Sequence, residues 1–146
     1  HKVILTPLSN TRLEAAELVK AMWEKTGATV VDMGAEEHDR ILAATSHLPH
    51  LLAYALVDTL ASLTDPEEIF GYAAGGFKDF TRIASSNPEM WCEIALANKE
   101  ALLNICRLFS QRFGALGAAL EAGDQQAIER VFTSAKTARD RFVVQE

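Results

Sequence analysis

The chain has 146 residues, of which 49% are hydrophobic and 23% charged, and its formal net charge is -6. A chain of this length buries roughly 70% of its unfolded surface, so we expect one compact domain and no room for a second complete one. The acidic balance supplies no basic field for a phosphate backbone or anionic lipid, which excludes nucleic acid and membrane surfaces as expected partners.

The longest apolar run, residues 51–63, contains Asp58 and Thr59 and is shorter than the roughly 20 residues that a bilayer span needs. We therefore expect no membrane helix. His1 and Lys2 lead directly into a β-type run rather than a signal peptide, and the two cysteines make a weak case for a disulfide. These features favour a reducing cytoplasm as the location.

Two runs rich in β-branched residues open the chain, at residues 2–6 (KVILT) and 28–33 (ATVVDM), and the segment between them has helical periodicity. This pattern predicts a strand, a helix and a second strand. Two strands alone leave their edges and faces without partners, so such a unit needs a larger sheet. We expect the chain to begin inside a larger fold.

The helix between these strands carries recognisable end signals. Ser9, Asn10 or Thr11 can cap its start, and Glu14 stands three residues after Thr11, which predicts a capping box. Gly27 stands where a C-terminal cap is expected.

From residue 36 onward the pattern is helical throughout, which predicts a mainly α fold. Pro49 is expected to kink or break the first long helix, because proline lacks a backbone donor. Asn87 is expected to cap a helix that has Pro88 at its first position, and Gly123 to end that stretch. The expected helices cover residues 36–46, 50–63, 87–122 and 125 to about 143.

Three of the four histidines lie within residues 37–50 (EHDRILAATSHLPH). His47 and His50 flank Pro49, where a helix break frees backbone groups and can direct a side chain into a cleft. The alternative is that both imidazoles satisfy local backbone groups. A metal site that adds His38 with Asp39 or Glu37 is a further alternative, although HxxH around a proline is much less specific than HExxH on an intact helix.

A second unusual stretch, residues 70–86 (FGYAAGGFKDFTRIASS), lies between predicted helices. Gly75 allows the backbone to approach a ligand, and residues 77–83 can form a short helix on which Lys78 favours a nearby anion. Arg82 offers a planar fork suited to a carboxylate. The alternative is a tight connection that buries its aromatic residues and leaves its charged residues, including Asp79, in solvent.

The remaining glycine, tryptophan and cysteine residues do not indicate a further functional site. Gly75 and Gly76 do not make a GxGxxG or GxxxxGK[ST] pattern, so they provide no support for dinucleotide or triphosphate binding. Four further residues are expected to fill core positions: Trp23, Trp91, Cys92 and Cys106.

The segments HKVILTP, HDRILAATSHLPHLLAYALVDTL, FGYAAGGFKDFTRIASSNPEMW and EIALANKEALL together resemble the C-terminal half of prephenate and arogenate dehydrogenases. SHLPH and GGFKDFTRIA are specific as a pair and occur in the family's order and approximate spacing. Lys78 stands where arginine is often found. The resemblance covers nearly the whole chain, and the stretch beyond about residue 114 is generic helix.

The resemblance implies two domains. Residues 1–34 would be the tail of a Rossmann-type nucleotide-binding domain, a strand-helix-strand remnant. Residues 35–146 would be an all-helical substrate-binding and dimerisation domain that forms an intertwined homodimer. Helices that are apolar on more than one face, at residues 51–63 and 101–113, also indicate an external partner.

The activity implied by the resemblance is oxidative decarboxylation of prephenate to 4-hydroxyphenylpyruvate in tyrosine biosynthesis, with arogenate as the alternative substrate. NAD or NADP would bind mainly to the N-terminal domain, which also carries the family's catalytic histidine. None of His1, His38, His47 or His50 matches that histidine, so no catalytic residue is assigned here and the chain alone is expected to be inactive.

The resemblance also implies site residues. His50 resembles the family's substrate-contacting histidine, and Arg82 its carboxylate-binding arginine. Gly75 would lie close to the substrate, Lys78 and Asp79 would shape the site, and His47 is a further candidate. A rival reading is a non-catalytic helical dimerisation module that senses tyrosine, since the family is often inhibited by that amino acid.

Overall fold

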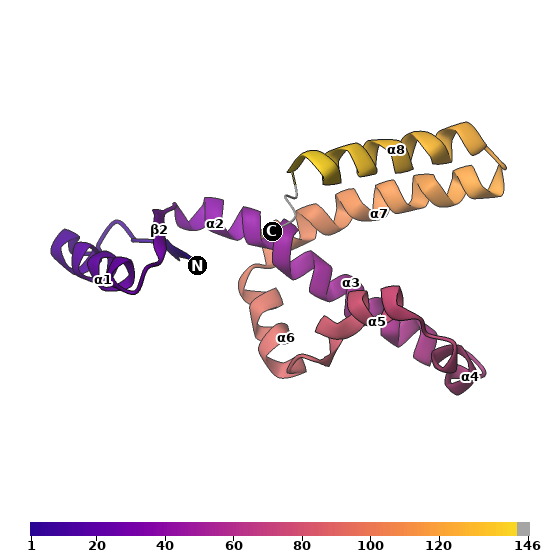
Figure 1. Ribbon diagram of the computed structural model, residues 1–146, viewed down its shortest axis with the longest axis horizontal. Coiled ribbons are helices and arrows are strands. Elements are labelled where there is room, and N and C mark those ends of the chain that lie inside the picture. The colour runs from indigo at the N-terminus through magenta and orange to yellow at the C-terminus, as the bar shows by residue number, and fades with distance from the viewer. Residues whose placement is uncertain (143–146) are drawn as a thin grey trace. The chain divides into compact units, whose positions relative to one another are not determined.

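The computed structural model describes residues 1–142 (Figure 1), and the chain divides into two compact units, His1–Leu103 and the residues from Asn104 onward. The length had predicted a single compact domain, and that expectation is wrong. The physical reason lies in how little apolar surface the chain buries against itself. Among the described residues, the buried hydrophobic residues are Ala43, Ala53 and Leu102.

The first unit opens with the predicted strand-helix-strand segment. Strands β1 (Lys2–Leu5) and β2 (Thr29–Asp32) are parallel, with Lys2 opposite Thr29 and Leu5 opposite Asp32. Helix α1 (Leu13–Lys25) joins them and contacts both, and Lys20 Nζ lies 2.7 Å from Asp32 Oδ2. Gly27 ends the helix at a φ of 84°, which confirms the predicted C-terminal cap.

The predicted capping box at the start of α1 is wrong. The N-cap residue is Arg12, and it makes no side-chain capping hydrogen bond. The Thr11 hydroxyl instead takes part in the turn before the helix, where its Oγ1 accepts a hydrogen bond of 2.9 Å from the Leu8 amide. A turn that closes from Leu8 to Thr11 thus competes with helix capping for the same hydroxyl.

The histidine-bearing segment is a continuous run of helix: α2 (Ala35–Leu42), the π-helical turn η1 (Ala43–His47) and α3 (Leu48–Ala61). Pro49 was expected to kink or break this run; the helix is not broken there, but its regular α-helical hydrogen bonding is interrupted by the π turn just before the proline. Within the π turn the Leu48 amide donates to the Ala43 carbonyl, five residues earlier. Proline in an α-helix loses one hydrogen bond and clashes with a carbonyl four residues back, and the wider π turn just before it accommodates both effects.

Short helices follow: α4 (Pro66–Gly71), α5 (Gly75–Thr81), the 3-10 turn η2 (Arg82–Ser85) and α6 (Pro88–Ala97). The expected short helix at residues 77–83 is confirmed, starting two residues earlier, whereas α4 was not predicted. Asn87 caps α6 as predicted, since its Oδ1 accepts a hydrogen bond of 2.9 Å from the Met90 amide. Helix α3 contacts α4, α5 and η2, so it is the element around which this part of the unit is arranged.

The single helix expected over residues 87–122 is two helices. Asn98 interrupts it with φ -106° and ψ 33°, and α7 (Lys99–Glu121) begins directly afterwards. The sequence pattern missed this break because the apolar periodicity continues through it. The break instead follows a tertiary contact of the Asn98 side chain, described below.

The second unit contains most of α7 together with α8 (Gln125–Phe142). The two helices form a hairpin (Figure 1). Gly123 at φ 63° makes the turn, as predicted, and Asp124 caps α8 by accepting a hydrogen bond of 2.9 Å from the Ala127 amide. The expected end of this helix, near residue 143, lies outside the described residues. No helix within residues 1–142 is long and apolar enough to span a bilayer.

Candidate functional site

The two histidines of the SHLPH segment lie against one indole. His50, in the first turn of α3, stacks on Trp91 of α6 with ring centroids 3.4 Å apart and an angle of 19° between the planes. His47, the last residue of the π turn, meets the same indole edge to face at 6.1 Å and 74°. Trp91 therefore joins the start of α3 to α6 and holds both imidazoles in one place.

The hydrogen bond of His50 settles which ring nitrogen carries a proton. Its Nδ1 lies 2.9 Å from the carbonyl oxygen of Ser46. A carbonyl oxygen can only accept, so Nδ1 of His50 donates. Nε2 is then the nitrogen through which His50 can meet a ligand.

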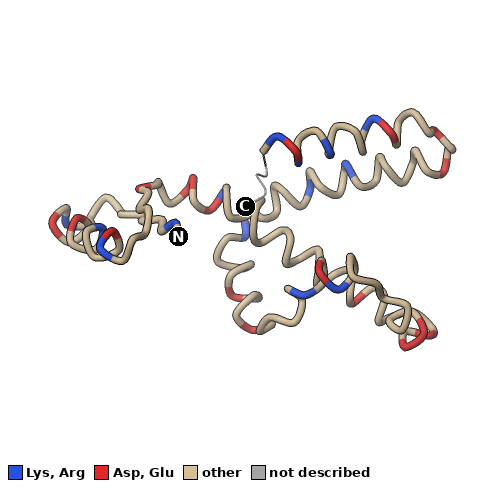
Figure 2. Tube along the Cα trace, in the orientation of Figure 1, with Lys and Arg blue, Asp and Glu red and all other residues tan. Residues whose placement is uncertain are grey.

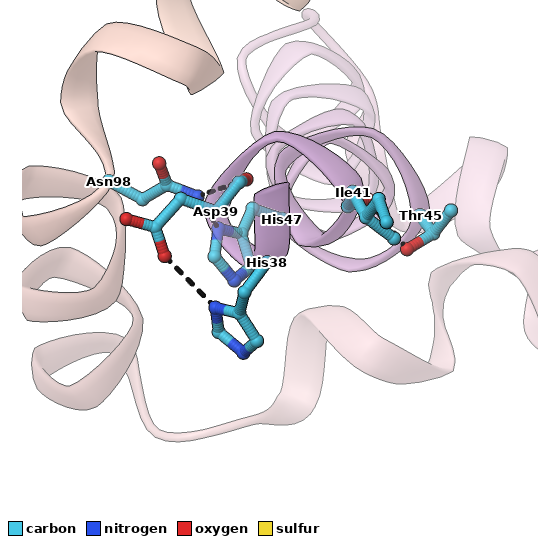
Figure 3. Close-up of polar contacts among 6 residues, drawn as sticks. All are labelled: His38, Asp39, Ile41, Thr45, His47 and Asn98. Carbon is cyan, nitrogen blue, oxygen red and sulfur yellow. Dashed lines mark hydrogen bonds and ion pairs between the residues drawn. The ribbon is translucent and has the colours of Figure 1, made fainter. Parts of the chain in front are cut away.

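His47 belongs to a polar cluster with Asn98 and Asp39 (Figure 3). Asn98 Nδ2 lies 2.7 Å from the backbone oxygen of Asp39 and 3.2 Å from Nδ1 of His47. Burial lowers the pKa of His47 from its ordinary value of 6.5, partly opposed by the charge of Asp39 and reinforced by His38 and His50. The environment of His47 thus favours the neutral imidazole.

His38 takes part through a different contact, since its Nδ1 lies 3.0 Å from Oδ1 of Asp39 (Figure 3). No group of three or more His, Cys, Asp or Glu side chains within residues 1–142 is arranged to hold a metal ion. The alternative of a metal site at His38, His47, His50 and Asp39 therefore has no geometric support in the described part of the chain.

The α5–η2 segment carries the remaining predicted site residues. Gly75 begins α5, and Lys78 and Asp79 are exposed on it, while Arg82 is exposed at the start of η2. Figure 2 shows both basic (blue) and acidic (red) positions in the part of the chain where α5 lies. The segment is fastened to α3, because the Tyr54 hydroxyl donates to the Ser86 carbonyl at 2.7 Å. His50 lies on α3 and Arg82 on η2, and these two elements contact one another.

The glycines at the start of α5 are not demanded by packing within the chain. A Cβ at Gly75 or Gly76 would meet nothing within 4 Å, and neither residue has a positive φ. The short helix also does not bury all its aromatic residues, because Phe80 is 47% exposed. The connection is consequently more open than the tight, buried alternative.

Three residues of this site were not singled out by the sequence: Trp91, Asn98 and Tyr54. Trp91 was expected to fill a core, but it is half-buried and supports the histidine pair. The other core expectations are also not met, because Trp23 and Cys92 are exposed and Cys106 is half-buried. The available signal for Trp91, Asn98 and Tyr54 was that all three residues lie in the segments that carry the family resemblance.

Two hollows in the first unit lie away from the histidine pair. One of about 210 Å³ is lined by residues from the far end of α3, from α4 and from α5, including Leu60, Phe70 and Phe77. Another of about 260 Å³ lies between the end of β1 and α1, with Thr6, Pro7 and Ala16 in its wall. Both walls are mostly apolar, so neither offers the charged groups that a carboxylate ligand requires.

Comparison with known proteins identifies close relatives of this architecture. A family model described as the dimerization domain of prephenate dehydrogenase matches residues 34–134. The cyclohexadienyl dehydrogenase of Zymomonas mobilis is 37% identical over 141 residues, which is 95% of this chain and 48% of that protein.

Similar solved structures come from the same group of enzymes. A crystal structure of prephenate dehydrogenase from A. aeolicus in complex with hydroxyphenyl propionate and NAD+ has a TM-score of 0.86 at 41% identity, over 94% of this chain and 49% of that one. Synechocystis arogenate dehydrogenase has a TM-score of 0.83 at 25% identity, over 97% of this chain and 52% of that one. The chain spans about half the length of these relatives. It belongs to the prephenate dehydrogenase family, whose dimerization domain its residues 34–134 match.

Proposed function

We propose that this chain supplies substrate-binding residues and the dimer interface of a prephenate dehydrogenase, which converts prephenate to 4-hydroxyphenylpyruvate by oxidative decarboxylation with NAD or NADP. The observation that carries the proposal is the histidine pair on Trp91 at the start of α3, the helix that also contacts α5 and the Arg82-bearing turn η2. Arogenate is the second candidate substrate, favoured by the likeness to the Synechocystis enzyme.

The division of labour within the site follows from the chemistry of each side chain. Arg82 presents a planar set of N–H donors that pairs with a carboxylate in a bidentate manner. His50 offers Nε2 to the ligand, and His47 lies beside it. Gly75, Lys78 and Asp79 border the carboxylate end. Their joint contribution is orientation of the substrate, which lowers the entropic part of the barrier.

The nicotinamide cofactor belongs to another part of the enzyme. In this chain β1 is followed by Thr6, Pro7 and Leu8, without a glycine-rich turn, and Pro7 removes a backbone amide where a pyrophosphate would need one. These residues do not fit a dinucleotide site. We propose residues 1–34 as the tail of a nucleotide-binding domain and residues 35–146 as the helical domain, a division supported by the family model starting at residue 34.

A homodimer is part of the proposal. Large apolar side chains are exposed on α7 and α8, including Phe113 at 66%, Leu120 at 63% and Phe132 at 59%. Apolar surface of this kind requires a covering partner, and a second copy of the chain provides it in a family defined by a dimerization domain. We further propose the cytoplasm as the location and tyrosine as an inhibitor that competes for the same carboxylate contact.

The decisive experiment measures turnover by the complete enzyme on prephenate and on arogenate with each nicotinamide cofactor. Arg82→Ala removes a charged hydrogen-bonding partner worth about 1.5 to 3 kcal/mol, so KM for the preferred substrate is expected to rise by roughly 10- to 150-fold. Arg112→Ala, an exposed arginine on α7, is the matched control and should leave KM unchanged. An unchanged KM in Arg82→Ala would refute the carboxylate role.

Absence of turnover on both substrates would instead favour the non-catalytic module that senses tyrosine. The 146-residue chain alone is expected to be inactive at any cofactor concentration, since it has neither a dinucleotide site nor the family's general base. Activity of the chain alone would overturn the domain division.

The dimer is tested separately by sedimentation equilibrium of the 146-residue chain. We expect a dimer at high micromolar concentration, because the exposed apolar faces of α7 and α8 then find a partner. A strictly monomeric chain at that concentration would contradict the interface.

A further inference from the structure

Asn98 has features of a residue that positions another side chain. It is only 8% exposed, and it lies at the break between α6 and α7. Its two partners are distant in the sequence, since Asp39 lies 59 residues and His47 lies 51 residues before it. The side-chain hydrogen bonds of Asn98 therefore connect distant parts of the chain and do not cap a neighbouring helix end.

The direction of each hydrogen bond can be worked out from the partners. The backbone oxygen of Asp39 can only accept, so the NH2 group of Asn98, and not its oxygen, must face it. The same nitrogen has a second hydrogen, which points to Nδ1 of His47 at 3.2 Å. Nδ1 of His47 must then provide a lone pair, and a neutral His47 carries its hydrogen on Nε2.

Most neighbours of His47 favour its neutral form, and Asp39 is the exception. His38 and His50 disfavour a positive charge on His47, as does burial, whereas the carboxylate of Asp39 favours it. That carboxylate is itself within 3.0 Å of Nδ1 of His38. The remaining ring neighbour, Trp91, is uncharged and packs edge to face on His47.

We propose that Asn98 is a positioning residue that holds His47 as a neutral imidazole with its hydrogen on Nε2. His47 then acts as a hydrogen-bond donor through Nε2, while a neutral His50, whose Nδ1 donates to Ser46, acts as an acceptor through its own Nε2. The pair offers opposite hydrogen-bonding characters to one ligand. A ligand hydroxyl, which can accept from His47 and donate to His50, suits this pair, and the ligand's carboxylate goes to Arg82. This last step rests on the proposed function, whereas the tautomer of His47 does not.

The first test is NMR of the 146-residue chain labelled with 15N-histidine, because the two nitrogens of a neutral imidazole have different 15N shifts according to which one carries the hydrogen. The wild type is expected to show His47 as the Nε2–H form with a titration midpoint below 6.5. An Nδ1–H form in the wild type would overturn the inference, whatever the enzyme's activity proves to be.

Asn98→Asp replaces the donor by a carboxylate, which can only accept. His47 is then expected to carry hydrogen on Nδ1 and to titrate at a higher pH than in the wild type. An unchanged tautomer and midpoint in a folded Asn98→Asp chain would contradict the positioning role. Should this variant not fold, the wild-type spectrum still decides the question.

The same change alters how stability depends on pH. The pKa of His47 is lowered by folding, so its contribution is complete above 6.5 and is lost as pH falls below 6.5 toward the folded value. Urea unfolding at pH about 7.5 and about 5.5 should therefore show a smaller loss of stability on acidification in Asn98→Asp than in the wild type. An equal loss in both proteins would count against the inference.

In the complete enzyme Asn98→Asp is expected to lower kcat/KM at neutral pH by roughly tenfold, which corresponds to about one misdirected hydrogen bond. The pH profile of kcat/KM should shift to higher pH, which a merely structural defect would not cause. The two proposals fail separately: an enzyme without turnover on either substrate refutes the function, and a wild-type His47 in the Nδ1–H form refutes the role of Asn98.

Discussion

The helices around the histidine pair, residues 35–98, and the hairpin, residues 104–142, are held together by different kinds of contact. In the first region Asn98 bonds to Asp39 and the Tyr54 hydroxyl reaches Ser86, so hydrogen bonds join elements far apart in the sequence. In the hairpin the hydrogen bonds of the Asn104, Lys136 and Thr137 side chains link residues three or four apart.

The difference fits the two tasks that we propose for these regions. A ligand site must hold polar side chains in one geometry, which requires contacts between elements that leave few rotamers available. A dimerisation surface requires exposed apolar area, and local hydrogen bonds are sufficient to keep a helix helical while its apolar face awaits a partner. The contacts of the first region suit the proposed ligand site, and the exposed apolar side chains of the hairpin suit the proposed dimer interface.

The largest effect on stability is expected from Trp91→Ala, which removes the indole that His47 and His50 share. We expect the free energy of unfolding to fall by about 3 kcal/mol, the lower end of the range for a tryptophan, because Trp91 is half-buried. Urea unfolding at fixed protein concentration measures this change.

Trp23→Ala is the matched control, because Trp23 is 39% exposed on α1, away from the histidine pair. It should cost roughly 1 kcal/mol or less. Equal losses for the two tryptophans would show that the stacked arrangement adds no stability of its own, and the distinction between the two regions would lose its main support.

A smaller effect is expected from Tyr54→Phe, which deletes only the hydroxyl that donates to Ser86. The loss should be about 1 kcal/mol, because the Ser86 carbonyl loses its partner and η2 is no longer fastened to α3. The corresponding change in the hairpin is Thr137→Val, which removes an exposed hydroxyl bonded to the Thr133 carbonyl one turn earlier.

We expect Thr137→Val to change stability by less than about 0.5 kcal/mol, since a local hydroxyl contact of this kind contributes little to a helix. Both variants can be compared in one series of urea unfolding curves. A greater loss for Thr137→Val than for Tyr54→Phe would reverse the comparison between the two regions.

Local chemistry accounts for what could be predicted about the fold. The β-branched runs predicted both strands, Gly27 and Gly123 were identified as helix ends, and Asn87 as a cap, each from residue types that act on their immediate neighbours. The candidate site was found in part in the same way, because SHLPH and the glycine-rich segment before Arg82 are unusual in a helical chain.

The wrong predictions about helix ends have a common cause. Each was overridden by a hydrogen bond or backbone adjustment that the local sequence pattern does not reveal. Thr11 was available to cap α1 but accepts from Leu8 instead. Pro49 was expected to kink or break a helix, and the helix continues through it because a π turn precedes the proline. The apolar periodicity around Asn98 predicted one helix, and the break is made by a side chain whose partners lie more than 50 residues earlier.

The sequence by itself determined the mainly α character and the opening strand-helix-strand segment, because helix and strand signals are local. It proposed the histidines and Arg82 as site residues through the family resemblance. Only the tertiary structure decided that Trp91 supports both imidazoles, that Asn98 sets the hydrogen bond of His47, and that η2 is fastened to α3. These arrangements depend on which distant side chains meet in a buried place, and there each polar group must find its partner or lose free energy.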